Sequence, residues 1–308
     1  MRVPRLSRRR AGAIGNRIRV RVRLSLALAA LVLGAAAAAP AARLALERPA
    51  AATTTADVVF HSRALDSSLH FLLQLPDGYD QTDLRYPVVY FLHGLPAGPT
   101  SYRSVAWVEN ALDRAGRPAL LVVPQGTRQV GGDPEYHDWG PGRNWATALG
   151  VELPAYVDAH YRTIANRSGR AIVGISAGGY GAASIGLGHP SRFSVVESWS
   201  GYFEPTDPTG TKVLDLGSRD ADEAANVHAL ANRLRGQFRR YPTLLAFYVG
   251  RSDPTFVGEN EQLHRELNAA HVPHDFDVYP GGHTFALWRA HARAWLALAL
   301  RRLAPAAP

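Results

Sequence analysis

Residues 170–181 read Arg-Ala-Ile-Val-Gly-Ile-Ser-Ala-Gly-Gly-Tyr-Gly, an apolar β-type segment that runs into Gly-x-Ser-x-Gly and then into small residues. This is the order of a nucleophile elbow, in which a strand delivers a serine to a tight turn and a helix begins directly behind it. Such a turn strains the serine backbone. Gly174 and Gly178 would remove the Cβ atoms that otherwise collide with the neighbouring strand and helix. Because the motif also occurs by chance in glycine-rich chains, its surroundings decide whether Ser176 is a nucleophile.

The basic charge of the chain is concentrated at its start. The 308 residues carry a formal net charge of +8, and nine arginines lie within the first 23 residues, where there is no acidic residue. The rest of the chain therefore has a formal net charge of about −1. Nucleic-acid-binding domains carry clustered basic residues, so nucleic acid is not an expected partner.

An apolar segment, Leu24–Gly34, follows the arginines and continues as alanines up to Ala39. A basic region, an apolar region and small residues around 37–42 are typical of an export signal. We therefore interpret residues 1–42 as an export signal and expect the protein to be secreted or to reside in the cell envelope. The alternative is an uncleaved anchor that holds the protein at the membrane, because residues 24–42 are just long enough to span a bilayer.

The sequence predicts neither a metal nor a cofactor. The chain has no cysteine, which excludes disulfides and thiol catalysis and is compatible with an oxidising exterior. His271 and His274 lie close in the sequence but lack a third ligand at a suitable spacing.

Residues 43–56 are rich in Ala, Thr and Pro and are interpreted as a linker, and residues 57–305 form the expected globular domain. Most of its predicted strands are continuous apolar runs, the pattern of a sheet buried on both faces. Strands are expected at 57–64, 68–75, 86–92, 119–123, 170–175, 193–196, 244–249 and 276–279. Helices are expected near 105–115, 152–161, 178–187, 222–236, 258–270 and 284–302.

Strands that alternate with helices predict an α/β fold, with a mostly parallel, doubly wound sheet flanked by helices in a single domain. An antiparallel pair is expected to open the sheet. Two long loops, 125–147 and 202–221, interrupt the alternation. Long loops at the carboxyl edge of such a sheet are where substrate pockets are usually built.

A serine nucleophile needs a base that takes its proton and an acid that orients the base. After an elbow these residues follow in the order Asp or Glu, then His. Asp253 follows the predicted strand 244–249, and His283 follows the strand 276–279, so both are expected at the sheet edge that carries Ser176. The predicted catalytic residues are therefore Ser176, Asp253 and His283.

The two later residues also have simpler interpretations. Asp253 precedes a proline, where aspartate commonly initiates a turn or caps a helix. His283 follows two glycines and could stand beside a helix start without taking part in chemistry. Glu259 is a second choice for the acid. The joint order of the residues after Ser176 favours the catalytic interpretation.

Acyl transfer also needs two N–H donors at the oxyanion of its tetrahedral intermediate. Ala177, the residue after the nucleophile, is expected to supply one. The second is expected in the loop after the strand 86–92, where His93-Gly94-Leu95 stands. Leu95 N–H is the candidate, with Gly94 allowing the backbone to approach closely. The alternative for this loop is an ordinary turn at a strand end.

These motifs together resemble the esterase D-like esterases of the α/β-hydrolase fold. That group includes S-formylglutathione hydrolases, enterochelin esterases and the secreted mycolyltransferases of the actinobacterial envelope. The matching stretches cover the whole domain and are Tyr90–Gly94, Gly174–Gly179, Gly250–Asp253 and Gly281–Trp288. Further stretches, Tyr136–Trp139, Asn144–Trp145 and Glu152–Val157, are most similar to the mycolyltransferase branch.

The resemblance implies a serine esterase that hydrolyses carboxylic esters through an acyl-enzyme, acting on a small-molecule or glycolipid ester. It leaves two alternatives: an acyltransferase that passes the acyl group to a sugar hydroxyl, or a non-catalytic envelope-binding relative. The mycolyltransferase branch carries Asp-Gly-Leu-Arg at the oxyanion loop and Glu as the triad acid. This chain has His93-Gly94-Leu95-Pro96 and Asp253 instead.

Two aromatic residues, Trp139 and Phe285, are candidates for the wall of a substrate pocket. Their alternative role is packing in the core or in a lid. For Trp145 and Trp288 we favour packing.

Overall fold

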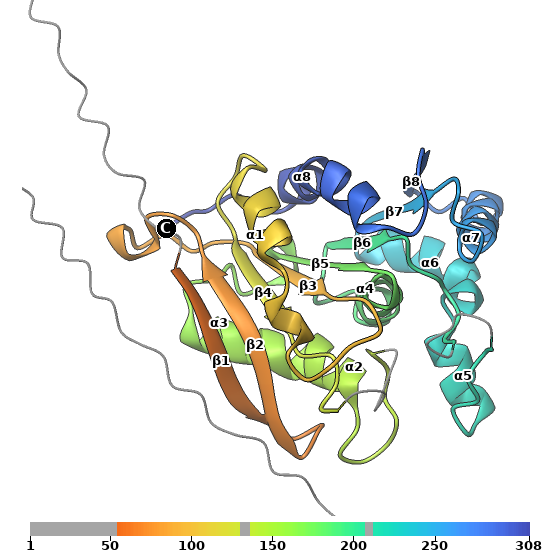
Figure 1. Ribbon diagram of the computed structural model, residues 1–308, viewed down its shortest axis with the longest axis horizontal. Helices are drawn as coiled ribbons and strands as arrows, with labels where there is room; N and C mark the ends of the chain where they lie inside the picture. Colours follow the sequence, from red (N-terminus) through yellow and green to blue (C-terminus); the bar gives the residue numbers. More distant parts are fainter. Residues whose placement is uncertain (1–53, 130–135, 207–211) are drawn as a thin grey trace, which may run out of the picture. The chain divides into compact units, whose positions relative to one another are not determined.

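An eight-stranded sheet forms the centre of the computed structural model, which describes residues 54–129, 136–206 and 212–308. Its strand order is β1-β2-β4-β3-β5-β6-β7-β8 (Figure 1). The strands are β1 Thr54–Ser62, β2 Ser67–Leu75, β3 Val88–Leu92, β4 Leu120–Pro124, β5 Arg170–Ile175, β6 Val195–Trp199, β7 Leu244–Gly250 and β8 Asp275–Tyr279.

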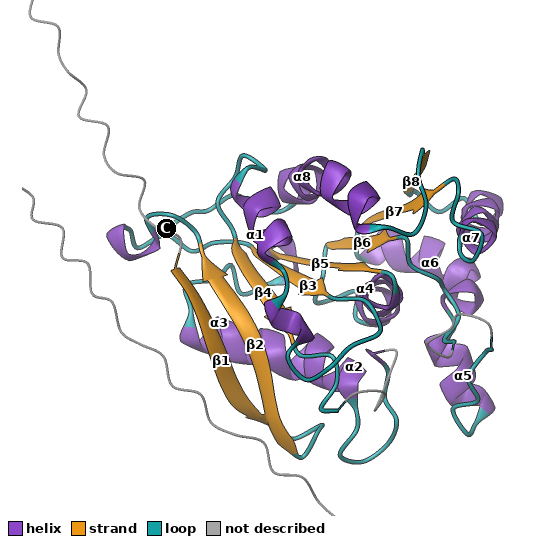
Figure 2. Cartoon of the chain, viewed as in Figure 1, coloured by secondary structure: helices purple, strands orange, loops and turns teal. Residues whose placement is uncertain are grey.

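The sheet is mostly parallel. β1 pairs antiparallel with β2, and β2 pairs antiparallel with β4, whereas every pairing from β4 to β8 is parallel (Figure 2). Every residue of β3, β4, β5 and β6 is buried, as expected for strands covered on both faces. The predicted antiparallel opening and the parallel body of the sheet are both confirmed.

Helices cover both faces of the sheet (Figure 2). They are α1 Ala106–Asp113, α2 Trp145–Thr147, α3 Leu153–His160, α4 Ala177–Gly188, α5 Arg219–Ala225, α6 Val227–Arg240, α7 Val257–Ala269 and α8 Phe285–Arg302. Alternate residues of β3 face the two sides: Val89 and Phe91 pack in the cluster that includes α1 and α8, while Val88 and Tyr90 pack in the cluster that includes α3, α4 and α6. The sheet therefore separates two apolar cores, as a doubly wound fold requires.

Three differences from the expected elements have a clear structural cause. β1 begins at Thr54, inside the predicted linker 43–56, because residues 54–56 pair with the end of β2. The helix expected at 222–236 is two helices, because the backbone of Asn226 is extended between them. The Asn226 side chain accepts a hydrogen bond from Ala229 N–H and so caps the start of α6. β6 continues past residue 196 to Trp199, through the buried Glu197.

The predicted export signal or anchor, residues 1–42, and most of the linker lie outside the described residues. Within the residues that are described, no helix is both long enough and apolar enough to cross a membrane.

Candidate active site

Ser176 stands at the sharp turn between β5 and α4. Its backbone has φ +53° and ψ −124°, a conformation that L residues with a side chain rarely adopt. Its N–H donates to the carbonyl of Trp199 at the end of β6 at 2.9 Å. Its carbonyl accepts from the N–H groups of Gly179 and Tyr180, at 2.8 and 3.1 Å. Backbone bonds on both sides thus hold the strained turn.

The two glycines of the motif sit where no side chain fits. A Cβ on Gly174 would overlap the carbonyl oxygen of Gly178, and a Cβ on Gly178 would overlap that of Leu92. The small residues therefore allow β5, the turn and α4 to pack at this distance, as the sequence predicts.

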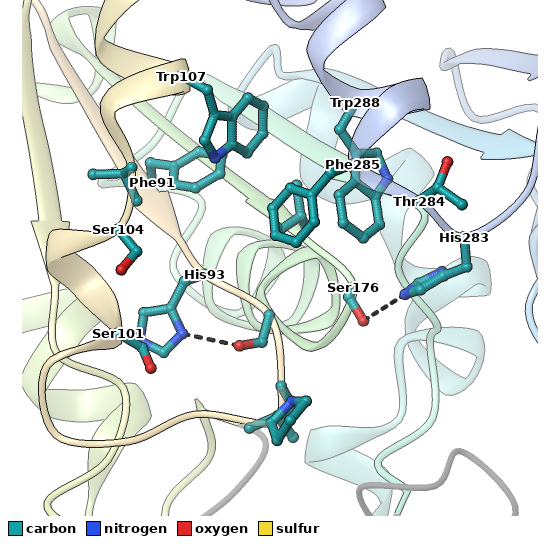
Figure 3. A pocket seen from close by; sticks show the side chains of 15 residues that line it. Phe91, His93, Ser101, Ser104, Trp107, Ser176, His283, Thr284, Phe285 and Trp288 are labelled. Carbon is teal, nitrogen blue, oxygen red and sulfur yellow. Dashed lines mark hydrogen bonds between the residues drawn. The ribbon is translucent and has the colours of Figure 1, made fainter.

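Ser176, His283 and Asp253 form one hydrogen-bonded series. His283 Nε2 lies 2.9 Å from Ser176 Oγ, drawn as a dashed line in Figure 3. His283 Nδ1 lies 2.8 Å from Asp253 Oδ2. Because an ionised carboxylate only accepts hydrogen bonds, Nδ1 carries the proton, and Nε2 is left to accept from the serine hydroxyl. This is the tautomer that a general base for Ser176 requires.

The acid is buried and held on its far side. Asp253 is 1% exposed, and its Oδ1 accepts hydrogen bonds from the N–H groups of Thr255 and Phe256, at 3.2 and 3.1 Å. The turn-forming role and the histidine-binding role of this aspartate are thus carried by different oxygens. Both interpretations of Asp253 raised by the sequence describe real contacts.

The second choice for the acid, Glu259, lies elsewhere. Its carboxylate accepts hydrogen bonds from the backbone N–H groups of Phe203 and Glu204, after β6. It also lies 3.5 Å from His228 Nε2. The histidine beside Glu259 is therefore His228, whereas His283 is bound by Asp253.

The end of β6 also supports the aromatic side of the site. Trp288 packs its ring edge-on against His283, with centroids 5.0 Å apart, and its Nε1–H donates to Ser200 Oγ at 3.0 Å. Ser200 N–H in turn donates to the carbonyl of Tyr248 on β7. Trp288 is buried, so packing is one of its roles, but it also lines the cavity at Ser176.

The loop after β3 lies directly against the serine. A Cβ on Gly94 would stand 3.1 Å from Ser176 Cβ, a tight contact that would push the two residues apart by a few tenths of an ångström. Within the described part of the chain, neither Leu95 N–H nor Ala177 N–H donates a hydrogen bond to another residue. Both predicted oxyanion donors are thus next to Ser176 in the chain or in space and remain unpaired.

A cavity of about 600 Å³ opens beside Ser176 and His283. Its apolar walls include Trp107, Phe285 and Trp288, and Figure 3 shows Ser104 across the cavity from Ser176 and His283. Phe285 is 52% exposed and packs edge-on against both tryptophans, with centroids 6.1 and 5.1 Å away. The expected place of Phe285 in a pocket wall agrees with this geometry.

Trp139, the other pocket candidate, does not line this cavity. Its ring packs on the His137 ring, with centroids 4.2 Å apart, and the Arg143 guanidinium lies over the Trp139 ring, 5.4 Å from its centroid. Trp145 is fully buried, as favoured from the sequence. The sequence did not single out Trp107, because its place in the wall depends on how α1 packs beside α8, which no local pattern reveals.

His93 also lines this cavity. Burial lowers the pKa of this histidine, so it is neutral at pH 7. In the parts of the chain described by the structure, no group of three or more His, Cys, Asp or Glu side chains could hold a metal ion.

A family model described as "Putative esterase" matches residues 62–296. The chain belongs to this esterase family. The resemblance inferred from the motifs is thereby confirmed, and the matched region contains all the predicted catalytic residues.

Individual relatives of this esterase-family chain include an esterase of Mycobacterium tuberculosis, 29% identical over 238 residues, or 68% of this chain and 51% of the relative. The chain thus spans about half the length of that relative. A diacylglycerol acyltransferase/mycolyltransferase of Mycobacterium leprae is 34% identical over 77 residues, which cover 25% of this chain and 23% of the relative.

Solved structures confirm the fold. A ferulic acid esterase superposes with a TM-score of 0.70 at 23% sequence identity. The superposition covers 82% of this chain and 99% of the ferulic acid esterase. The predicted α/β-hydrolase fold is therefore correct.

Proposed function

We propose that the chain is a serine carboxylic ester hydrolase in which Ser176 is the nucleophile, His283 the general base and Asp253 the residue that orients the base. The observation that carries this proposal is the hydrogen-bonded series from Asp253 Oδ2 through both nitrogens of His283 to Ser176 Oγ. Family membership supports ester chemistry, and the cavity beside Ser176 offers space for a substrate.

The proposed reaction proceeds in two halves. In the first, Ser176 Oγ attacks the ester carbonyl carbon while its proton passes to His283 Nε2. The N–H groups of Leu95 and Ala177 hold the resulting oxyanion. Collapse of this intermediate breaks the bond to the alcohol, which leaves with the proton from His283 and leaves an acyl-enzyme.

In the second half, a water gives a proton to His283 and attacks the acyl-enzyme carbonyl. A second oxyanion forms at the same two N–H groups. Its collapse releases the carboxylic acid and returns the proton to Ser176 Oγ. No step needs a redox partner or a cofactor.

The direct test is the Ser176→Ala variant with p-nitrophenyl esters and a fluorophosphonate probe. The wild-type protein should release p-nitrophenol and form a covalent adduct at Ser176, and the variant should do neither, with at least a 10³-fold loss of kcat. Unchanged circular dichroism of the variant serves as the folding control. Turnover that survives in Ser176→Ala would remove the triad assignment. A folded wild-type protein that never forms the adduct would favour a non-catalytic envelope-binding relative.

Acyl transfer to a sugar hydroxyl is the second candidate, supported by the local similarity to a mycolyltransferase. The two reactions share the acyl-enzyme and differ in the nucleophile that removes it. An ester series from acetate to long acyl chains, assayed with and without trehalose, separates them. Free acid as the product in both conditions supports hydrolysis, whereas acylated trehalose supports transfer.

Export is the last part of the proposal. The arginine-rich start, the apolar segment and the small residues that follow support a signal within residues 1–42. The proposed location is outside the cytoplasmic membrane, either secreted or in the cell envelope.

A further inference from the structure

The loop after β3 contains a buried histidine that the proposed reaction does not use. His93 is 6% exposed, and its Nδ1 lies 3.0 Å from the carbonyl oxygen of Gly94. Because a carbonyl only accepts hydrogen bonds, Nδ1 carries the proton in the neutral ring. Nε2 is buried and has no hydrogen-bond partner among the described residues. The ring therefore makes one directed polar contact, to the loop backbone itself.

This contact fixes the peptide that contains the proposed oxyanion donor. Gly94 C=O and Leu95 N–H belong to the same peptide unit, which is planar and trans, so the two bonds point in opposite directions. In Figure 3 His93 lies on one side of the loop, with the dashed line to its acceptor, and Ser176 lies on the other side. A carbonyl drawn toward His93 turns Leu95 N–H toward the serine.

Tyr136 holds the preceding carbonyl of the same loop. Its hydroxyl donates to His93 O at 2.5 Å, and its ring meets the His93 ring edge-on with centroids 5.8 Å apart. Tyr136 is 2% exposed, and its backbone has φ +55°, a strained conformation for a residue with a large side chain. Strain of this kind persists where the surrounding structure enforces it and is concentrated at functional sites.

Two glycines make the space for Tyr136. A Cβ on Gly126, after β4, would stand 2.7 Å from the tyrosine hydroxyl. A Cβ on Gly181, in the helix that follows Ser176, would stand 2.8 Å from the tyrosine ring. Tyr136 is therefore wedged between the nucleophile helix α4 and the oxyanion loop, and it ties the position of one to the other.

We propose that His93 and Tyr136 are positioning residues for the oxyanion hole: His93 orients the Gly94–Leu95 peptide, and Tyr136 locks the loop at a fixed distance from α4. This inference rests on the proposed function, because it concerns a donor that acts only when an ester carbonyl is attacked. Neither side chain touches the reacting atoms. Their removal should affect the transition state and leave substrate binding nearly unchanged.

The test uses three variants of the full chain in p-nitrophenyl ester turnover. Tyr136→Phe removes only the hydroxyl, and His93→Leu removes the Nδ1 donor. In His93→Asn the side-chain amide N–H₂ stands close to the position of Nδ1 and keeps a donor for Gly94 O. Loss of a direct oxyanion donor costs about 10²–10³ in kcat, so misplacing one should cost about 10- to 100-fold. We expect that loss in Tyr136→Phe and His93→Leu, with KM within about twofold of wild type.

The conservative variant and a matched control separate positioning from general stability. His93→Asn should recover most of the kcat that His93→Leu loses. Tyr86→Phe also removes the hydroxyl of a buried tyrosine, which lies 2.8 Å from Thr82 Oγ1, before β3 begins and away from the oxyanion loop. It should lower the melting temperature to a similar degree as Tyr136→Phe while kcat stays near wild type.

Two results would overturn the inference: folded Tyr136→Phe with wild-type kcat, or equal losses in His93→Asn and His93→Leu. If His93→Leu does not fold, Tyr136→Phe and His93→Asn decide between the same outcomes. Failure of the proposed function looks different, because the wild-type protein would then show no turnover that depends on Ser176. Normal turnover in wild type together with normal turnover in Tyr136→Phe rejects only the positioning role.

Discussion

Ser176 illustrates how a single residue can be held in an unfavourable conformation. A positive φ at a residue with a side chain costs about 1–3 kcal/mol. Here three backbone hydrogen bonds to the N–H and carbonyl of Ser176 offset that cost. The turn also depends on glycines beside it that carry no side chain. Replacing such glycines by alanine therefore measures how tightly the turn is packed.

Gly178→Ala and Gly188→Ala lie in the same helix, α4, and should have opposite effects. A Cβ on Gly178 would overlap Leu92 O, whereas a Cβ on Gly188 meets nothing within 4 Å. We expect Gly178→Ala to destabilise the protein by about 1–3 kcal/mol, as overpacking does. Gly188→Ala should stabilise it by about 0.5–1 kcal/mol, because alanine is a better helix former. Urea unfolding of both variants gives the comparison, and equal effects of the two substitutions would contradict this packing.

Glu197 is a buried acid in the middle of β6. It is fully buried, and Trp199 Nε1–H donates to its Oε2 at 2.9 Å. Burial raises the pKa of Glu197 to about 8, from the usual 4.5. The folded protein therefore keeps a proton that the unfolded chain loses above pH 4.5. The contribution of this carboxyl to stability is complete below about pH 4.5, decreases as the pH rises to about 8 and is constant above that.

The isosteric variant Glu197→Gln tests this dependence on pH. It cannot ionise and keeps a carbonyl oxygen that can accept from Trp199. Wild type and variant should differ least near pH 5, and the variant should be the more stable protein at pH 8–9. Melting temperatures of the two proteins from pH 5 to 9 provide the measurement. Parallel curves across that range would show that Glu197 ionises in the folded protein as it does in the unfolded chain.

At the scale of elements, two carboxylates at the start of α7 bind two different neighbouring segments. Asp253, just before the helix, binds His283, whereas Glu259 in its first turn binds the backbone after β6. The two acids are close in sequence and have different tasks. The proposed task of Asp253 is catalytic, and Glu259 holds the loop after β6 in place.

Asp253→Ala and Glu259→Ala should therefore separate activity from stability. Asp253→Ala should reduce kcat by about 10⁴-fold, as loss of the orienting acid does in comparable triads. Glu259→Ala leaves two backbone N–H groups without an acceptor and should cost about 1–3 kcal/mol of stability. Its folded fraction should turn over esters at nearly the wild-type rate. A loss of kcat in Glu259→Ala comparable to that in Asp253→Ala would reassign the triad acid.

The sequence predicted those elements whose signals are local. Continuous apolar runs indicated the buried strands, and the order of Ser176, Asp253 and His283 followed from strand ends that share one sheet edge. What failed depends on partners distant in the chain. β6 continues through Glu197 because it pairs with β5 on one side and β7 on the other, and β1 starts at Thr54 because β2 lies beside it. The proposed role of Tyr136 likewise requires two glycines from different parts of the fold.

At the scale of the whole molecule, the excess of positive charge lies in the first 23 residues of the sequence. The full chain has a calculated isoelectric point of about 10.0, yet the sequence after its arginine-rich start is nearly neutral. Removal of the first 23 residues would take away nine arginines and none of the residues of the proposed triad.

The proposed export allows two outcomes for the N-terminus, cleavage or retention. If the signal is cleaved, sequencing of the mature protein should find its N-terminus near residues 37–42. Isoelectric focusing of the same sample should place it far below pH 10. A secreted or envelope-bound protein that retains its first residues would instead support the anchor.

The end of β6 has a consequence for how the enzyme could change its substrate. The carbonyl of Trp199 accepts a hydrogen bond from the N–H of the proposed nucleophile. Ser200 Oγ accepts one from Trp288, the tryptophan that packs on the proposed base. Neither Trp199 nor Ser200 takes part in the proposed reaction. The residues that hold the proposed catalytic groups in place, the frame, are thus different from those that form the cavity wall, such as Phe285 and Trp107. Mutant libraries that vary the wall and leave the frame intact should yield new ester preferences at little loss of folded protein.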